Sequence, residues 1–422
     1  MFTGMTTFDL IVVGGGPAGA AATLYAKRHG LRTLLLDKAS FPRDKICGDA
    51  LSGKSISVLD ELGLLDEIHQ LPGALIKEIV FGSPSHVDAH IDLKRYDHRD
   101  AMTGRVLPGG GFVIRRQIFD HFLFNKARLA ADRCIEGFSV RDLIFEDGTV
   151  CGVRGESSGE HAEFRAPVVL GCDGFSSVVA RKTGLYQHDS RHGVVALRCY
   201  FENVKGLTKQ IELHFVEEAL PGYFWIFPLD NNCANVGIGT LHRHIRKRHA
   251  KLKTALDTVI SRDPFRERFA DASPLEEPVG WNLPLGSRHR QCYGDGFMLL
   301  GDAAGLIDPF TGEGIGNALY SGRIAAEVAA QAVASGDCSA AVMRNYDERL
   351  WGTIGNELKT STRLQQLGRW RPLLNYVITR AARDETVSDH ICGMIANVVP
   401  KQELTSPLYY LKLLMSRSPR GS

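Results

Sequence analysis

The sequence predicts an α/β fold with three parts: a parallel sheet wound with helices, an antiparallel sheet, and a helical C-terminal region. Residues 8–38 (FDLIVVGGGPAGAAATLYAKRHGLRTLLLDK, with Lys38 last) predict a strand, a glycine turn, a helix and a second strand. Residues 192–204 and 209–241 contain strand-like runs separated by turn residues, which favours an antiparallel sheet. From about residue 336 onward the pattern becomes helical.

The composition bounds the class of protein. The chain of 422 residues has a formal net charge of +2, which does not indicate nucleic acid as a partner. Its nine cysteines are scattered without a CxxC pair, which argues against a zinc site and is typical of reduced thiols in the cytosol. The residues before the first strand are too few for a signal peptide, and no run of about 18 apolar residues predicts a transmembrane helix. We expect a cytoplasmic protein, with peripheral membrane attachment left open.

The first strand-turn-helix-strand unit carries a nucleotide-binding motif. Gly14, Gly16 and Gly19 form GxGxxG: the first allows the tight turn, the second lets main chain approach a pyrophosphate, and the third lets helix and strand pack closely. The helix N-terminus offers free N–H groups to the phosphates. Asp37, with Lys38 beside it, closes the second strand where a carboxylate can bind a ribose hydroxyl. The motif predicts a dinucleotide site and does not separate NAD from FAD.

Two later segments favour FAD. Residues 166–181 contain an apolar strand that ends at Asp173 and is followed by a helix start, and residues 295–327 contain another that ends at Asp302. A long alanine-rich helix then begins after Gly314. Ligands gather beyond the carboxyl ends of parallel strands. There Asp302 can accept hydrogen bonds from a ribityl chain, and the Gly314 amides can face the pyrimidine end of a flavin. We therefore predict a Rossmann-type FAD-binding domain.

Three further motifs give the chain a family resemblance. VIRRQIFD at 113–120 has RxxFD spacing, and with the segments above it resembles the p-hydroxybenzoate hydroxylase-type flavoproteins. FPRDKICGDA at 41–50 is similar to the KxCGG/GDA loop of the geranylgeranyl reductase family. The stretch 223–239 matches that family's YxWxFP motif, followed after eight residues by GxG. The resemblance covers about residues 8–335, with Asp37 where glutamate is usual and Ala50 where glycine is common.

The motifs and the resemblance together indicate which residues contact cofactor and substrate. Arg116 is expected as a counter-charge to the pyrophosphate, and a solvated arginine at a helix start is the alternative. The resemblance places Cys47 on a loop that approaches the flavin, where its thiol gives a proton or shapes the pocket; a small buried side chain without a catalytic role is the alternative. The expected FAD contacts are Gly14, Gly16, Ala18, Gly19, Asp37, Lys38, Cys47, Gly48, Ala50, Arg116, Val140, Asp173, Gly301, Asp302, Gly314 and Ile315. The expected substrate contacts are Tyr223, Trp225, Phe227, Pro228, Gly237 and Gly239.

The wide spread of these motifs predicts a discontinuous FAD-binding domain. We expect it to comprise residues 1–75, 105–185 and 285–335, with a substrate-binding domain from 76–104 and 186–284 and a C-terminal helical region from 336–422. No second GxGxxG motif stands in a strand-turn-helix context, so no separate nicotinamide domain is predicted. The external reductant is then NADPH, ferredoxin or another carrier that docks transiently.

The aromatic strand has two different faces. At strand periodicity Tyr223, Trp225 and Phe227 share one face, while Phe224 and Ile226 share the other. We expect the first face to form the wall of a prenyl tunnel beside the flavin, because aromatic rings tolerate apolar chains and attract developing cations.

The leading functional prediction is an FAD-dependent reductase that saturates C=C bonds of a geranylgeranyl-type isoprenoid lipid by hydride transfer from reduced flavin. Pro228 is expected to end the aromatic strand, and a turn at Gly237 and Gly239 to close the tunnel and leave room for the chain. One alternative is an FAD monooxygenase or halogenase, although Tyr223 and Phe227 replace the outer residues of the WxWxIP motif usual in such halogenases. Another is a flavin electron-transfer protein at a membrane, although the scattered cysteines offer no iron–sulfur cluster.

A basic segment is the remaining feature. LHRHIRKRHAKLK at 241–253 packs nine basic or histidine residues into thirteen positions. A solvated helix face explains it without function. The functional hypothesis is a dock for the membrane surface, through anionic lipid headgroups, or for an acidic electron-donor protein.

Overall fold

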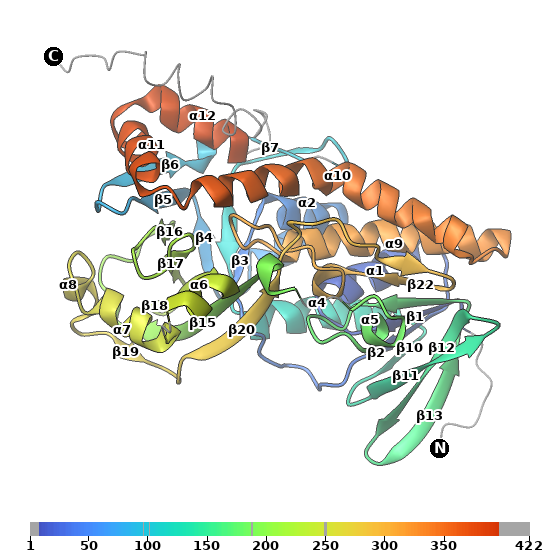
Figure 1. Cartoon of the computed structure of the whole chain (residues 1–422). Helices are drawn as coiled ribbons and strands as arrows, with labels where there is room; N and C mark the ends of the chain where they lie inside the picture. Colours follow the sequence, from blue (N-terminus) through green and yellow to red (C-terminus); the bar gives the residue numbers. More distant parts are fainter. Residues whose placement is uncertain (1–7, 96, 101, 187–188, 249–250, 396–422) are drawn as a thin grey trace.

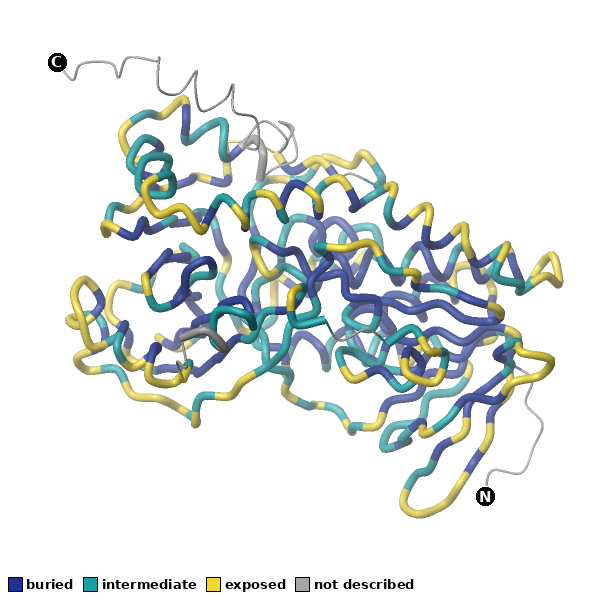
Figure 2. The backbone as a smooth tube through the Cα atoms, in the orientation of Figure 1, coloured by how far each residue is buried: buried dark blue, intermediate teal, exposed yellow. Residues whose placement is uncertain are grey.

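The computed structural model describes residues 8–95, 97–100, 102–186, 189–248 and 251–395, and its first large sheet, on the right in Figure 1, has six strands. Its strands are β10 (Arg133–Ile135), β2 (Thr33–Leu36), β1 (Leu10–Val13), β14 (Val168–Gly171), β22 (Phe297–Leu299) and β21 (Tyr293–Gly294), in this spatial order. Every neighbouring pair is parallel except β21 with β22. All residues of β1, β2 and β14 are buried, as a sheet covered on both faces requires (Figure 2).

Helices cover one face of this sheet and a smaller sheet covers the other (Figure 1). On the first face α1 (Pro17–Arg28) packs between α4 (Arg116–Ala130) and α9 (Ile315–Ser335). On the second, β12 (Thr149–Ser157) packs against β14 and forms an antiparallel sheet with β11 (Ser139–Glu146) and β13 (Glu160–Arg165). Strands β11 and β12 form a hairpin that turns at Asp147-Gly148, and α5 (Val178–Lys182) follows β14.

The glycine turn after β1 depends on the absence of side chains. Gly14 has a φ of +106°, and a Cβ there would stand 2.4 Å from the carbonyl oxygen of Cys172. A Cβ on Gly19 would stand 1.8 Å from the carbonyl oxygen of Gly14. Only glycine at both positions lets α1 begin so close to the strand, as the motif predicts.

The second large sheet has eight strands and is antiparallel except where β16 pairs with β5 in parallel. It comprises β19 (Ser273–Pro274), β15 (Gly193–Glu202), β18 (Cys233–Leu241), β17 (Tyr223–Pro228), β16 (Gln210–His214), β5 (Glu78–Gly82) and β6 (Asp88–Asp92) in this order, with β20 (Val279–Pro284) also paired to β15. All of these strands come from 76–104 and 186–284, the two segments expected to form the substrate-binding domain. The domain boundaries themselves stay a prediction.

The hairpin of β17 and β18 corrects the expected glycine turn. Gly237 and Gly239 lie inside β18, paired with Trp225 and Tyr223. The chain reverses instead at Asn231-Asn232, where both residues have positive φ. A Cβ on Gly237 would stand 2.1 Å from the Trp225 ring, so this glycine makes room for an indole and not for a ligand chain.

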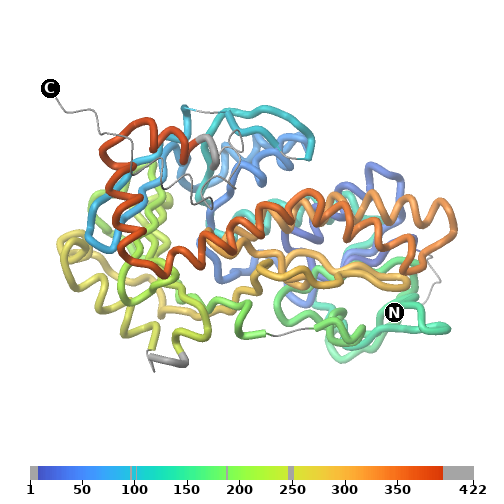
Figure 3. The backbone as a smooth tube through the Cα atoms, turned by 45° about the horizontal axis from the view of Figure 1, so that its top comes forward, coloured from blue at the N-terminus to red at the C-terminus, as the bar shows by residue number. Residues whose placement is uncertain are grey.

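The C-terminal helices lie over both large sheets. The long helix α10 (Ala340–Leu367) runs beside α9, and α11 (Arg371–Arg383) and α12 (Glu385–Ile395) pack on β6 (Figure 3). Residues 396–422 of the expected helical C-terminal region lie outside the described residues. No helix within the described ranges combines the length and the apolar character needed to cross a bilayer.

The basic segment 241–253 begins on β18 and spans α6 (His242–Arg248) and the start of α7 (Leu252–Ile260). The side chains at 246–250 are outside the description, so the docking hypothesis stays a prediction. The other elements are α2 (Gly53–Glu61), α3 (Leu65–Ile68), α8 (Arg266–Phe269), β3 (Ala50–Leu51), β4 (Ala74–Ile76), β7 (His98–Arg99), β8 (Val106–Leu107) and β9 (Gly111–Val113).

Candidate functional site

A cavity of about 900 Å³ lies between the two large sheets. One side is formed by loops beyond the carboxyl ends of β1, β2, β14 and β22, and the other by β15, β17 and β20. The predicted residues that line it are Gly14, Gly16, Ala18, Asp37, Lys38, Cys47, Gly48, Ala50, Arg116, Val140, Asp173, Gly301, Asp302, Gly314, Ile315, Tyr223, Trp225, Phe227 and Gly239. Gly19, Pro228 and Gly237 are not among the residues that line it.

The nucleotide end of the cavity fits the ADP half of FAD. The turn at Gly16 faces open space, because a Cβ there would meet only the Arg43 guanidinium, at 3.6 Å. Asp37 lies at the end of β2, and its carboxylate accepts hydrogen bonds from the N–H groups of Gly15 (2.7 Å) and Ala39 (2.8 Å). These bonds fix the carboxylate beside the glycine turn, where a ribose hydroxyl would lie.

Two arginines share one buried carboxylate beside this turn. Arg116 Nε donates to Asp120 Oδ1 at 2.6 Å, and Arg43 Nη1 donates to Asp120 Oδ2 at 2.9 Å. Burial opposes the charged form of Arg116, but Asp120 and Cys47 outweigh it and the pKa of Arg116 lies above its ordinary value. Two guanidinium charges against one carboxylate leave a net positive charge for a pyrophosphate.

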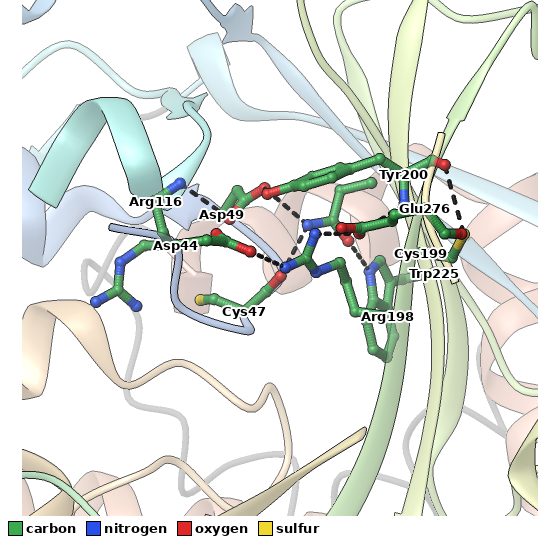
Figure 4. Close-up of polar contacts among 10 residues, drawn as sticks. Asp44, Cys47, Asp49, Arg116, Arg198, Cys199, Tyr200, Trp225 and Glu276 are labelled. Atoms are coloured by element: carbon green, nitrogen blue, oxygen red, sulfur yellow. Dashed lines mark hydrogen bonds and ion pairs between the residues drawn. The ribbon is translucent and has the colours of Figure 1, made fainter. Parts of the chain in front are cut away.

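The Cys47 loop lies between α4 and the second sheet (Figure 4). The thiol of Cys47 faces the Arg116 guanidinium. Two residues on, Asp49 has a φ of +67° and a fully buried side chain. Its Oδ2 accepts from Tyr200 Oη and from Asn235 Nδ2, both at 2.8 Å. Burial raises the pKa of Asp49 to about 6, although the hydrogen bonds from Asn235 and Tyr200 act in the opposite direction.

Arg198 supports the same loop from β15. Its guanidinium is buried, donates to Asp44 and Glu276 at 2.5 Å each, and lies 4.0 Å from the centroid of the Tyr200 ring (Figure 4). Residues of the second sheet therefore hold the loop through Asp44 and Asp49, one at each end of the KICG stretch.

The aromatic face of β17 contacts the loops on either side of the cavity. A Cβ on Gly48 would stand 3.1 Å from the Phe227 ring, so the Cys47 loop rests on this face. Tyr223 Oη donates to the carbonyl oxygen of Thr311, in the loop that precedes α9. The Tyr-Trp-Phe face thus lines the cavity and also joins two loops that carry predicted flavin contacts.

The loop before α9 holds a partly buried acid. Glu313 Oε1 accepts from the N–H of Gly316 at 2.5 Å and lies 3.2 Å from Ser52 Oγ. Burial raises the pKa of Glu313, and the nearby Lys54 ammonium acts in the opposite direction. Lys54 itself is buried and pairs with Glu357 of α10 at 2.6 Å, which ties this end of the cavity to the C-terminal helices.

Lys45 bridges the two sides of the cavity at its polar end. Its Nζ lies 4.1 Å from the centroid of the Trp281 ring on β20 and 3.9 Å from Asp302 Oδ2. Burial lowers the pKa of Lys45, and Asp302 opposes this shift. A cation thus lies beside the aspartate expected to bind the ribityl chain.

An apolar arm extends the cavity beyond the aromatic face. It is lined by strands β5, β16 and β20 and by α12, and no charged side chain lies among the residues that these elements contribute to the arm. These residues are Ile79, Phe81, Ile211, Leu213, Leu283 and Ile391. The cavity therefore joins a polar nucleotide end to a hydrocarbon end.

Sequence reasoning assigned no role to several residues of the site. Asp49, Tyr200, Asn235, Arg198 and Lys45 were not singled out. Two signals were present: Asp49 follows Cys47-Gly48 in a quoted motif, and an asparagine in a strand of otherwise apolar residues indicates a buried hydrogen bond.

Asp173 was predicted as a cofactor contact and has a second role in the structure. Its Oδ2 accepts from the N–H of Val178 at 2.6 Å and of Val179 at 3.3 Å, which caps α5. Burial raises the pKa of Asp173. Its contact with the cofactor stays a prediction.

Comparison with known proteins places the chain among flavoproteins. A family model described as FAD binding domain matches residues 7–349. Digeranylgeranylglycerophospholipid reductase 2 of Methanococcoides burtonii is 31% identical over 359 residues, which cover 84% of this chain and 82% of that protein. Reductase 2 of Methanopyrus kandleri is 30% identical over 365 residues, 85% of this chain and 86% of that protein. The chain belongs to this family of FAD-binding reductases.

Solved structures agree with the family. A geranylgeranyl bacteriochlorophyll reductase-like protein from Thermoplasma acidophilum superposes with a TM-score of 0.81 at 26% identity, over 99% of this chain and 98% of that one. The flavin-dependent brominase Bmp2 reaches a TM-score of 0.73 at 20% identity, over 93% and 94%. The second likeness shows the shared fold alone. The predicted family, the α/β fold and FAD as the cofactor are confirmed.

Proposed function

We propose that this protein reduces C=C bonds of a geranylgeranyl-type polyprenyl chain in an FAD-dependent reaction. The observation that carries the proposal is the cavity itself, because one continuous space joins the nucleotide end at Gly16 and Asp37 to the apolar arm at Ile211 and Leu213. The family relatives are named as reductases of a lipid that carries geranylgeranyl groups, which supports the same substrate class.

The residues of the chain bind the two reactants and keep water away. The chemistry that bound, reduced FAD would supply is a hydride for one carbon of the alkene. Arg43 and Arg116 balance the pyrophosphate charge, and the apolar arm with the Tyr-Trp-Phe face orients the chain and dries the site. The ring faces also stabilise positive charge that develops on the alkene. Cys47 Sγ, beside Arg116, is the candidate group that holds the proton for the other carbon.

The electron donor and the location of the enzyme are further parts of the proposal. The sequence contains a single GxGxxG motif in a strand-turn-helix context, so the donor is a carrier that docks transiently: NADPH, ferredoxin or another. A lipid substrate favours attachment at a membrane surface, and the basic segment 241–253 is the candidate contact.

The test is anaerobic single turnover. FAD-loaded protein is reduced with dithionite, freed of excess reductant and mixed with geranylgeranyl diphosphate or a digeranylgeranyl glycerophospholipid. We expect flavin reoxidation and a product heavier by two hydrogens for each bond reduced. The fully saturated lipid is the matched control and should leave the flavin reduced. Leu213→Trp should retain FAD and lose turnover, because the indole fills the apolar arm. Stable reduced flavin and unchanged substrate mass with both lipids would overturn the proposal.

A further inference from the structure

One side chain links the Cys47 loop to the aromatic strand. Asn235 lies on β18 and is fully buried. Its Nδ2 donates to the carbonyl oxygen of Cys47 at 2.7 Å and to Asp49 Oδ2 at 2.8 Å, and its Oδ1 accepts from Trp225 Nε1 at 2.9 Å. The amide oxygen faces the only donor and the amide nitrogen faces two acceptors, so a single orientation satisfies all three bonds.

The register of the hairpin explains why the link reaches both partners. Phe227 pairs with Asn235 and Trp225 pairs with Gly237, so Asn235 and Trp225 are diagonal neighbours on the cavity face. The glycine opposite Trp225 lets the indole lie flat across β18, which brings its N–H to the asparagine. A phenylalanine at position 225 fills most of the same space without that donor.

Other polar contacts of residues 44–47 are made by side chains: Asp44 with Arg198, Lys45 with Asp302, and the Cys47 thiol with Arg116. The loop has no regular secondary structure between Asp37 and β3. Tyr200 Oη binds the Asp49 side chain, and Gly48 rests on the Phe227 ring. The carbonyl of Cys47 is bound by Asn235 (Figure 4 shows this loop beside Trp225 and Tyr200). A buried carbonyl that loses its donor costs free energy, so the loop would move to find another partner.

We propose that Asn235 is a positioning residue for the reaction, and that it sets the position of Cys47 and Gly48 through the indole N–H of Trp225. The tryptophan of the aromatic motif is then required as a hydrogen-bond donor as well as a cavity wall. The effect on turnover rests on the proposed reduction. The hydrogen-bonded link through Asn235 is tested without substrate.

The test measures how fast iodoacetamide labels the Cys47 thiol in FAD-loaded protein, by mass spectrometry of the Cys47 peptide. Asn235→Leu removes all three bonds, and Trp225→Phe removes one donor. We expect each to raise the Cys47 labelling rate at least fivefold, and the double variant to exceed Asn235→Leu by less than twofold, because both act through one link. Tyr200→Phe, which keeps its ring and loses one bond to Asp49, should raise the rate less.

Two controls separate positioning from general loosening. Thr240→Val changes a buried residue of the same strand, on its opposite face, and should leave the Cys47 rate unchanged. Cys199 is buried on β15 and reports on the sheet itself. A rise confined to Cys47 supports the proposal. A rise at Cys199 equal to that at Cys47, no rise in Trp225→Phe, or additive effects in the double variant would overturn it.

Turnover gives a second readout. In single-turnover reduction, Asn235→Leu should lower the rate of flavin reoxidation at saturating lipid more than it raises the lipid concentration needed for half-maximal rate. If no lipid is reduced by the wild type either, the proposed function fails while the labelling result still decides the role of Asn235.

Discussion

The two faces of strand β17 use similar residues for different purposes. Phe224 and Ile226 are 0% exposed and pack with Val236 and Ile238 of β18 and with Leu256 of α7 in an ordinary core. On the other face all three aromatic side chains line the cavity, and the phenol and the indole N–H each donate a hydrogen bond. The difference shows that aromatic content alone does not distinguish core from binding site; the polar atoms and their partners do.

Substitutions on the core face of β17 should lower the free energy of unfolding more than substitutions on its cavity face. Phe224→Ala removes a fully buried ring and is expected to lower the free energy of unfolding by about 3–5 kcal/mol. FAD content per folded chain should stay unchanged, because Phe224 does not line the cavity. Urea unfolding followed by circular dichroism measures the loss. A loss below about 1 kcal/mol would mean that the two faces do not differ as described.

The free energy of unfolding should depend on pH through Asp49, in the loop that the cavity face holds. Because its pKa is raised from 3.8 to about 6, the folded protein binds a proton there more tightly than the unfolded chain does. This group therefore stabilises the fold below about pH 4, and the contribution is lost as the pH rises through about 6; the change is of the order of 3 kcal/mol. Asn tolerates positive φ, so Asp49→Asn should remove this pH dependence without backbone strain.

The measurement is the difference in unfolding free energy between Asp49→Asn and wild type at pH 4.5 and pH 7. The other carboxylates contribute equally to the unfolding free energy of both proteins, so their contributions cancel in the difference. Arg198 and Arg116 keep their charge at both pH values. We expect the variant to gain relative to wild type on going to pH 7. A difference that is independent of pH would show that Asp49 titrates normally in the folded protein.

A substitution on the cavity face should change turnover more than it changes the free energy of unfolding. Trp225→Phe is expected to cost roughly 1–2 kcal/mol, because one buried hydrogen bond is lost and Asn235 Oδ1 is left without its donor. FAD should be retained, while the rate of flavin reoxidation by a geranylgeranyl substrate, or the pattern of bonds saturated, should change. Melting curves and product masses provide the test. Unaltered products together with a large fall in melting temperature would assign this face to the core as well.

The smallest effect is expected at the outer end of the strand. Tyr223→Phe removes only the hydrogen bond to Thr311 and should cost about 0.5–1.5 kcal/mol. Because that bond joins the strand to the loop before α9, FAD affinity should weaken slightly. Fluorescence titration of the apoprotein with FAD measures this affinity. Phe227→Leu serves as the matched comparison, because the side chain of Phe227 forms no hydrogen bond. An FAD affinity equal to that of the wild type would show that the loop does not need this bond.

Local patterns predicted the parts of the site that depend on local geometry. The glycine turn, Asp37 and the two faces of β17 follow from spacing along a few residues. Two features depend on pairing between distant residues: the role of Asn235 was not predicted, and the turn at Gly237 and Gly239 was predicted wrongly. Asn235 binds residues 186 and 188 positions earlier in the chain. The Gly237/Gly239 pattern is typical of a turn, but its glycines serve the Trp225 ring, which only the register of the hairpin reveals.

The order of strands in the parallel sheet determines when each strand gains its neighbour during synthesis. Strand β14 is complete at Gly171, but its neighbour β22 is complete only at Leu299. At a synthesis rate of 5–20 residues per second, roughly 6–26 s separate the two events. During that time the apolar edge of β14 has no partner strand, and such edges recruit other chains. The nascent protein must therefore keep this edge away from other chains, for example with a chaperone, until β22 leaves the ribosome.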